Sequence, residues 1–284
     1  METLSKLYKS LTILTVLFIC SNVIFAQEDR PSLDEKLEFS AIAELGFVSV
    51  FDHKIQFSQS GTYFDYRRDG GQDVLFPVGR LSLELRSNRS TFYLLYQPLR
   101  LSSQVYLEED LIVDQAVFAA GTGVNLLYNF PFYRFSYTRE LAPNKPNFNF
   151  AMGASIQIRN ATISFESMDG SIFRTNRDVG IVPALKIRTN YHFNDRFYLE
   201  LEADGMYAPV SYLNGSDNEV VGAILDASLR TGYPLVDHVQ GFLNLRYLGG
   251  GAVGTSDNID GPGDGYVRNW LHFGTVTAGA KYTF

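Results

Sequence analysis

The chain has 284 residues, of which 45% are hydrophobic and 14% aromatic, and 24 basic against 31 acidic side chains give a net charge of −7. An acidic balance without a basic patch argues against nucleic acid as a partner. The single cysteine, Cys20, excludes a disulfide framework, so stability has to come from strand pairing and packing.

Residues 1–26 have the layout of a secretory signal peptide, with a basic start, an apolar stretch over 11–20 and Ala26 as the cleavage point. The stretch is shorter than the roughly 20 apolar residues of a spanning helix. Ile19 stands where a lipoprotein signal needs a small residue before Cys20. We therefore expect a cleaved signal peptide at 1–26, a periplasmic linker at 27–36 and one domain at 37–284.

Apolar and polar residues alternate with a period of two along most of the remaining chain, which predicts β-strands. Short connections alternate with longer polar ones, as in membrane barrels with short periplasmic turns and long external loops. We expect an all-β fold, a transmembrane up-and-down antiparallel barrel of about ten strands, with eight or twelve as alternatives. The expected strands are 37–51, 74–86, 91–106, 116–141, 147–165, 179–192, 196–208, 220–233, 239–248 and 270–284.

The terminal strand shows the alternation most clearly. Trp270, Val276 and Tyr282 share one face with small residues, whereas the other face is mostly polar. A strand that is apolar outward and polar inward suits a barrel in lipid. A soluble β-sandwich also alternates, but 19% charged residues and many aromatics at strand ends favour the membrane.

Two places leave the strand number open. The fourth strand is long enough to be split at 129–132, and 54–58 could pair with 62–66, either of which would add a hairpin. Within the fourth strand the outward parity is predicted to slip from even, at Leu126 and Tyr128, to odd, at Tyr133 and Phe135. Pro131 lies at the slip, which indicates a bulge.

Charged residues predicted to face the lumen are the candidate functional group. Bases of the sixth strand and acids of the seventh are expected to form a cross-strand ionic ladder. A ten-stranded lumen should be mostly filled, with at most a thin water path. This network is either a structural polar core or the lining of a narrow pore, and it consists of Arg80, Glu84, Arg86, Lys186, Arg188, Glu200, Glu202, Asp204, Asp226, Arg230 and Arg246.

No complete catalytic constellation is found. His53 and His272 are expected near the external rim on strands that become neighbours when the barrel closes, but histidines at a membrane rim are commonly interfacial anchors. The acidic, glycine-rich loop 257–265 lacks the ligand spacing of a calcium loop. We assign no catalytic residue, no cofactor and no metal.

The signal peptide, the meander of strands and the terminal strand ending on Tyr282 and Phe284 resemble small Gram-negative outer-membrane barrels, the OmpA-like and OmpX-like group. The resemblance implies a bacterial outer-membrane location, contact with outer-membrane lipid and lipopolysaccharide, and recognition of Phe284 by the barrel-assembly machinery. It covers proteins of many functions. We expect a monomeric barrel without catalytic activity that stabilises the membrane or presents external loops to a ligand or partner. The alternatives are a narrow solute or ion channel and a rim-located lipid hydrolase or protease.

Overall fold

The computed structural model describes residues 37–142, 145, 147–194, 196–209, 220–255 and 263–284, so the predicted signal peptide and linker lie outside the described residues. No helix in this part of the chain is long and apolar enough to cross a membrane. The regular structure there is β throughout. The strands are β1 (Leu37–Phe57), β2 (Phe64–Asp65), β3 (Leu75–Ser87), β4 (Ser90–Gln97), β5 (Arg100–Tyr106), β6 (Leu111–Val113), β7 (Ala116–Phe118), β8 (Gly123–Asn129), β9 (Phe132–Glu140), β10 (Phe148–Ser167), β11 (Phe173–His192), β12 (Tyr198–Pro209), β13 (Val221–Val236), β14 (Val239–Thr255) and β15 (Tyr266–Thr283).

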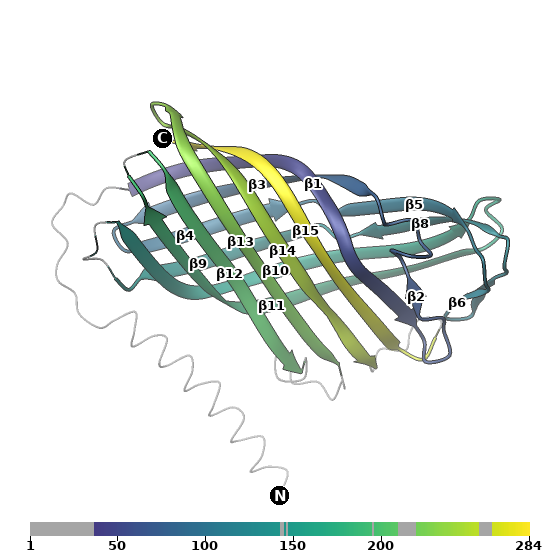
Figure 1. The fold of residues 1–284 in the computed structure, drawn as a ribbon. Helices are drawn as coiled ribbons and strands as arrows, with labels where there is room; N and C mark the ends of the chain where they lie inside the picture. Colours follow the sequence, from purple (N-terminus) through teal and green to yellow (C-terminus); the bar gives the residue numbers. More distant parts are fainter. Residues whose placement is uncertain (1–36, 143–144, 146, 195, 210–219, 256–262) are drawn as a thin grey trace, which may run out of the picture. The chain divides into compact units, whose positions relative to one another are not determined.

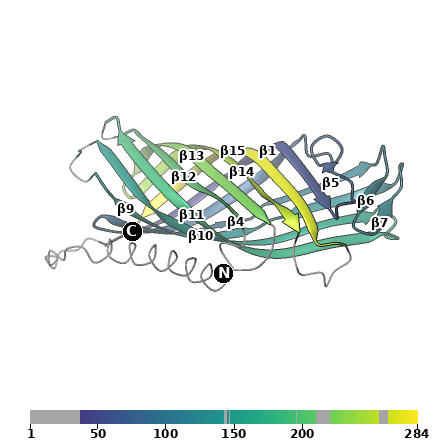
Figure 2. The ribbon, with the colours of Figure 1, turned by 90° about the horizontal axis from the view of Figure 1, so that it is seen from below.

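Ten of these strands close into one antiparallel ring, which confirms the predicted ten-stranded barrel (Figures 1 and 2). The order around the ring is β1, β3, β4, β9, β10, β11, β12, β13, β14 and β15, and β15 pairs with β1 from Ser40–Thr283 to Phe57–Val267. Closure matters because hydrocarbon offers no hydrogen-bond partner to a free strand edge. We call the end with Leu37 and Thr283 the turn end, and the opposite one the loop end.

Two strands of the wall are each broken into a pair of segments. β4 and β5 are separated by Pro98 and Leu99, and β8 and β9 by Phe130 and Pro131. The segments remain aligned, because β9 pairs with β4, β8 pairs with β5, and both β8 and β9 pair with β10. Prolines at the breaks account for the interruptions, since proline cannot donate to the ladder.

The twelve-strand alternative is wrong. The expected pairing of 54–58 with 62–66 forms only as the two-residue strand β2, which pairs with Lys54 and Ile55 and adds no strand to the wall. Residues 116–118, expected within the fourth strand, instead form β7, which pairs with β6 in a separate hairpin.

The predicted change of parity at Pro131 is also wrong. Leu126 and Tyr128 are each 2% exposed and face the interior, as Phe132 and Arg134 do on the other side of the break. Even-numbered residues therefore face inward along the whole strand. The alternation predicted the wrong outward face for Leu126 and Tyr128 because the interior of the barrel is apolar at the loop end. Apolar residues there do not mark the outer face.

A bulge occurs instead in β1. Its register with β15 shifts between Val50 and Asp52, so Val50 faces inward, Phe51 faces outward, and His53 faces inward again. Beyond the bulge the outer face becomes polar, and Lys54 pairs with Asp52 at 3.0 Å. β1 thus continues beyond its apolar outer face and ends later than predicted.

The outer face of the wall carries an apolar belt. These side chains are 40% to 74% exposed although they are large and hydrophobic. Such a belt matches the hydrocarbon layer that surrounds a membrane barrel. Members from around the ring are Leu45, Leu81, Leu83, Leu94, Phe135, Ile156, Leu185, Leu201, Leu225, Leu243 and Val276.

An arginine in the belt should destabilise the barrel. Leu83 is 42% exposed on the outer face of β3, and Leu83→Arg is expected to lower the free energy of unfolding in lipid by roughly 2 to 4 kcal/mol. Ser102→Arg is the matched control, because Ser102 is exposed on the outer face of β5 between Arg100 and Gln104. Urea unfolding in lipid vesicles measures both, and equal stabilities would place the belt outside the hydrocarbon.

Candidate functional site

The lumen is divided along its axis into three parts. A small vestibule opens at the turn end, a layer of paired charges fills the middle, and a larger cavity lies in the loop-end half. We call the middle layer the ionic plug. It consists of Glu44, Arg80, Glu84, Arg134, Lys186, Arg188, Glu200, Glu202, Asp204, Asp226, Arg230 and Arg246.

Asp226 on β13 is the centre of the plug. Its Oδ2 accepts a hydrogen bond from Arg134 Nη2 at 2.6 Å, and both of its oxygens accept from the guanidinium of Arg246. Arg134 also donates from Nη1 to Asp204 Oδ2 at 2.9 Å and from Nε to Gln157 Oε1 at 3.0 Å. The ion-paired side chains of this group are each at most 3% exposed, namely those of Arg134, Asp204, Asp226 and Arg246. Charge-assisted bonds of this kind offset the loss of hydration.

The predicted cross-strand ladder lies between β11 and β12. Lys186 stands opposite Asp204 in the register, and its Nζ lies 3.0 Å from Asp204 Oδ2 and 3.3 Å from Glu202 Oε2. Two residues closer to the turn end, Arg188 Nε donates a hydrogen bond to Glu200 Oε2 at 2.9 Å. The alternation of the two strands was enough to bring these bases and acids onto one inner face.

Glu44 lies buried on the inner face of β1 and belongs to the plug, although it is not among the charged residues predicted to form the network. Glu44 Oε2 accepts hydrogen bonds from Thr277 Oγ1 at 2.7 Å and Asn244 Nδ2 at 2.9 Å. Its Oε1 lies 3.6 Å from Arg80 and 3.7 Å from Arg230. Only the closed ring brings these partners together, so no local pattern could have identified the site.

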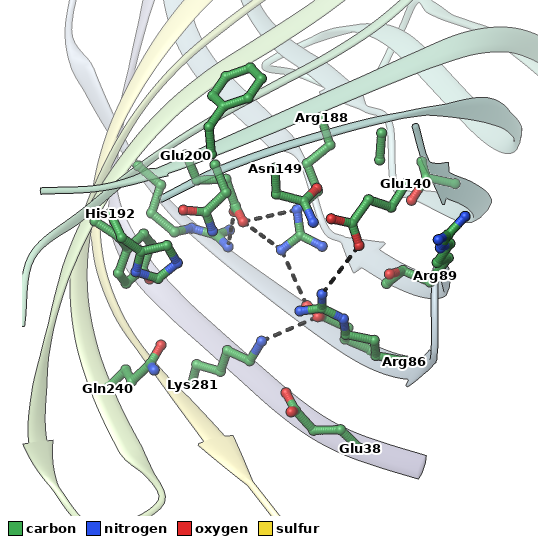
Figure 3. A pocket seen from close by; sticks show the side chains of 18 of the residues that line it. Glu38, Arg86, Arg89, Glu140, Asn149, Arg188, His192, Glu200, Gln240 and Lys281 are labelled. Carbon is green, nitrogen blue, oxygen red and sulfur yellow. Dashed lines mark hydrogen bonds and ion pairs between the residues drawn. The ribbon is translucent and has the colours of Figure 1, made fainter. Parts of the chain in front are cut away.

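Arg86 is the one predicted network residue that lies outside the plug. Its side chain is 46% exposed and its Nη2 is 3.7 Å from Glu140 Oε2. It lines the vestibule, a cavity of about 340 Å³ shown in Figure 3. There Lys281 Nζ lies 3.2 Å from Glu84 Oε1, and Arg188 Nη2 lies 3.5 Å from Glu84 Oε2. Residues lining the vestibule include Glu38, Arg86, Arg89, Glu140, Asn149, His192, Gln240 and Lys281.

The plug leaves little free space. The cavity found within it, bounded by Arg80, Lys186 and Glu202 among others, measures about 10 Å³. Holding one water requires about that volume. The vestibule and the cavity in the loop-end half share no lining residue, and the plug lies between them.

On one side of the loop-end half, an apolar cluster fills the lumen. Tyr66 from the 58–74 connection inserts between β1 and β8, stacks on His53 with ring centroids 4.5 Å apart, and is fully buried. His53 Nδ1 donates to Gln72 Oε1 at 2.7 Å. Residues of this connection thus fill the interior.

The other side of the loop-end half remains hollow. A cavity of about 900 Å³ lies between β10 and β11 on one wall and β13, β14 and β15 on the other. We call it the loop-end cavity. Its apolar lining includes Phe130, Phe132, Ile163, Leu248, Leu271 and Phe273, and Arg159 from β10 also lines it.

His53 and His272 lie on neighbouring strands, as predicted, but their side chains do not meet. Their strands are neighbours, with His53 opposite Leu271 and His272 opposite Asp52, but the two side chains face opposite sides of the wall. His53 is buried, whereas His272 Nδ1 lies 2.7 Å from the hydroxyl of Tyr247 on the outer face. The register between β1 and β15 places the two histidines on opposite faces of the wall, which the sequence alone did not indicate.

The predicted assembly signal lies at the turn end. Phe284 donates its backbone N–H to the carbonyl of Phe39 at 2.9 Å, and its exposed ring contacts the rings of Phe39 and Tyr282. Of the acidic loop 257–265, only 263–265 are described, and there Asp264 accepts backbone hydrogen bonds from Gln59 at 2.9 Å and Tyr266 at 3.0 Å. No three potential metal ligands meet within the described residues.

Comparison with known proteins finds distant likenesses among solved structures. No protein-family model matches the chain, and no curated protein matches it. Among solved structures, the transport unit of the autotransporter AIDA-I from Escherichia coli is 10% identical, with 97% of this chain and 99% of that chain covered and a TM-score of 0.37. OprG from Pseudomonas aeruginosa is 11% identical over 88% and 97%, with a TM-score of 0.33. Neisserial surface protein A is 12% identical over 87% and 97%, with a TM-score of 0.31.

Removing the central carboxylate should destabilise the barrel strongly. Asp226→Asn leaves Arg134 and Arg246 without their shared partner, and we expect the free energy of unfolding to fall by about 3 to 5 kcal/mol. Arg86→Gln, at an exposed pair, should change it by less than about 1 kcal/mol. Equal effects of the two substitutions in urea unfolding would show that the plug does not hold the barrel together.

Proposed function

We propose that this chain is a non-catalytic outer-membrane barrel that binds an apolar ligand in its loop-end cavity. The turn end faces the periplasm and the loop end faces the exterior, as the short and long connections of such barrels do. The cavity of about 900 Å³ carries this proposal, because it is lined mainly by apolar side chains and the plug lies on its turn-end side. Cavities of that size and lining are typical ligand sites.

The same geometry argues against the narrow-channel alternative. A conducting path would have to pass Asp226 and Lys186, whose partners lie within 3.0 Å and whose surroundings leave about 10 Å³ of space. Opening that path requires separating buried ion pairs, which costs several kcal/mol for each ion. A lipid hydrolase or protease is not favoured either, because His53 and His272 face opposite sides of the wall.

The proposal also covers secretion of the chain, its insertion into the membrane and its contact with lipid. The signal peptide at 1–26 would direct secretion, Tyr282 and Phe284 would be read during insertion, and the belt would contact lipid and lipopolysaccharide. Membership of the OmpA-like and OmpX-like group and a monomeric state belong to the same proposal. The exposed terminal ring of Phe284 supports it, since a recognition signal has to be accessible.

The refolded protein should be electrically silent in planar bilayers. Only material whose gel mobility shifts on heating is used, because that shift reports a folded barrel. We expect no discrete conductance steps, since the plug fills the lumen. Reproducible steps would overturn the closed-lumen part of the proposal and establish a channel.

Ligand binding is tested separately. An apolar fluorescent probe, N-phenyl-1-naphthylamine, is titrated into nanodiscs that contain the barrel, and the signal of empty nanodiscs is subtracted. We expect a saturable excess. A signal equal to that of empty nanodiscs would contradict the ligand-binding proposal.

A further inference from the structure

Arg159 is the feature of the loop-end cavity that the proposed function leaves unexplained. It lies on the inner face of β10 and lines the cavity. Its buried Nε has no hydrogen-bond partner, and no described carboxylate forms an ion pair with it. Its guanidinium lies 5.4 Å from the ring centre of Phe130. A charged group with a buried, unpartnered donor atom is costly, so this position calls for an anion that the described residues do not supply.

The other charges of the cavity do not fill that role. Arg174 is paired with Asp114, with Nε 2.6 Å from Oδ2. Asp178 and Arg177 line the same cavity but are exposed, and Asp178 forms no ion pair with Arg159. Every arginine of the plug, in contrast, forms an ion pair with a carboxylate.

The wall beside Arg159 is open. The ladder between β11 and β12 ends at Leu185–Gly205, and β12 continues to Pro209 paired only with β13. Among the described residues, no strand pairs with β11 on that side from Phe173 to Ala184. Pro183, which lacks a backbone N–H, follows the last pair toward the loop end. Figure 1 shows β12 diverging from β11 there.

The lining of the cavity confirms that it extends into this gap. It includes Gly180 and Val182 from the inner face of β11, and Ile181 and Pro183 from its outer face. One cavity can touch both faces of a strand only around a free edge. Ile181 is 66% exposed, and Ile156, which lies opposite Pro183 on β10 and also lines the cavity, is 50% exposed. The cavity is therefore continuous with the apolar belt.

We infer that the ligand is an amphipath with one acidic headgroup, a carboxylate or a phosphate, and that it reaches the cavity from the lipid phase between β11 and β12. The headgroup binds Arg159, and the hydrocarbon chain lies along the apolar lining toward Ile181. The inference rests on the proposed function, since it names the ligand class of the same cavity. A bidentate arginine contact suits a carboxylate or phosphate.

The test compares two probes that share a twelve-carbon chain and differ in headgroup, one anionic and one neutral. Radiolabelled dodecanoate and dodecan-1-ol are titrated into nanodiscs that contain the barrel, and binding to empty nanodiscs is subtracted. We expect dodecanoate to bind about tenfold more tightly than dodecan-1-ol, as a charge-assisted hydrogen bond would provide. Arg159→Gln should remove that difference and leave dodecan-1-ol binding unchanged, and Arg159→Lys should restore part of it.

Two further variants test the place of binding. A side chain at Gly180 would meet no atom within 4 Å of its Cβ, so Gly180→Trp should fill the cavity and weaken both probes about tenfold. Arg100→Gln, on the exposed outer face of β5, should change neither. A heat-shifted gel band shows that each variant is folded.

The outcomes separate the inference from the proposed function. Equal binding of both probes, with no effect of Arg159→Gln, would overturn the headgroup assignment while the apolar site stands. Binding unaffected by Gly180→Trp would overturn entry beside β11. No excess of either probe over empty nanodiscs would overturn both the inference and the proposed function.

Discussion

Charges inside a ten-stranded barrel have few partners other than one another, and the rest of the structure depends on this constraint. The lumen is too narrow for bulk water, so each base of the plug has to meet an acid at its own height along the axis. Lys186 meets Asp204, and Arg134 and Arg246 share Asp226. Because a slip of one residue would turn these side chains to the lipid side, the plug also fixes the strand register.

Toward the loop end the polarity of the two faces of the wall is reversed. Around the plug the outer face is apolar and the inner face is charged, whereas past Phe51 the outer face carries Asp52 and Lys54 and the inner face Ile55 and Phe57. The loop end is therefore built like a β-protein in water, with an apolar interior. This reversal creates an apolar site above a sealed lumen, which a uniform membrane barrel of this width would not have.

The sequence predicted what depends on local alternation and missed what depends on closure. Ten strands, the outer belt and the ladder at Lys186 follow from period-two patterns. The parity at Leu126 was wrong, because both faces can be apolar where the interior is apolar. Glu44, the separation of His53 from His272 and the gap beside Pro183 depend on register between distant segments, which a single sequence does not encode in any local pattern.

The partners of Glu44 have a consequence for how the barrel forms. Its hydrogen bonds to Asn244 and Thr277 join residues 200 and 233 positions apart in the chain. Contacts between such distant segments form slowly, since a long loop has to close first. The first strand must therefore wait for the last ones, and until the seam between β1 and β15 closes Glu44 has Arg80 on β3 as a partner but lacks Asn244 and Thr277. Ring closure and completion of the hydrogen bonds of Glu44 then become one late, cooperative step of folding.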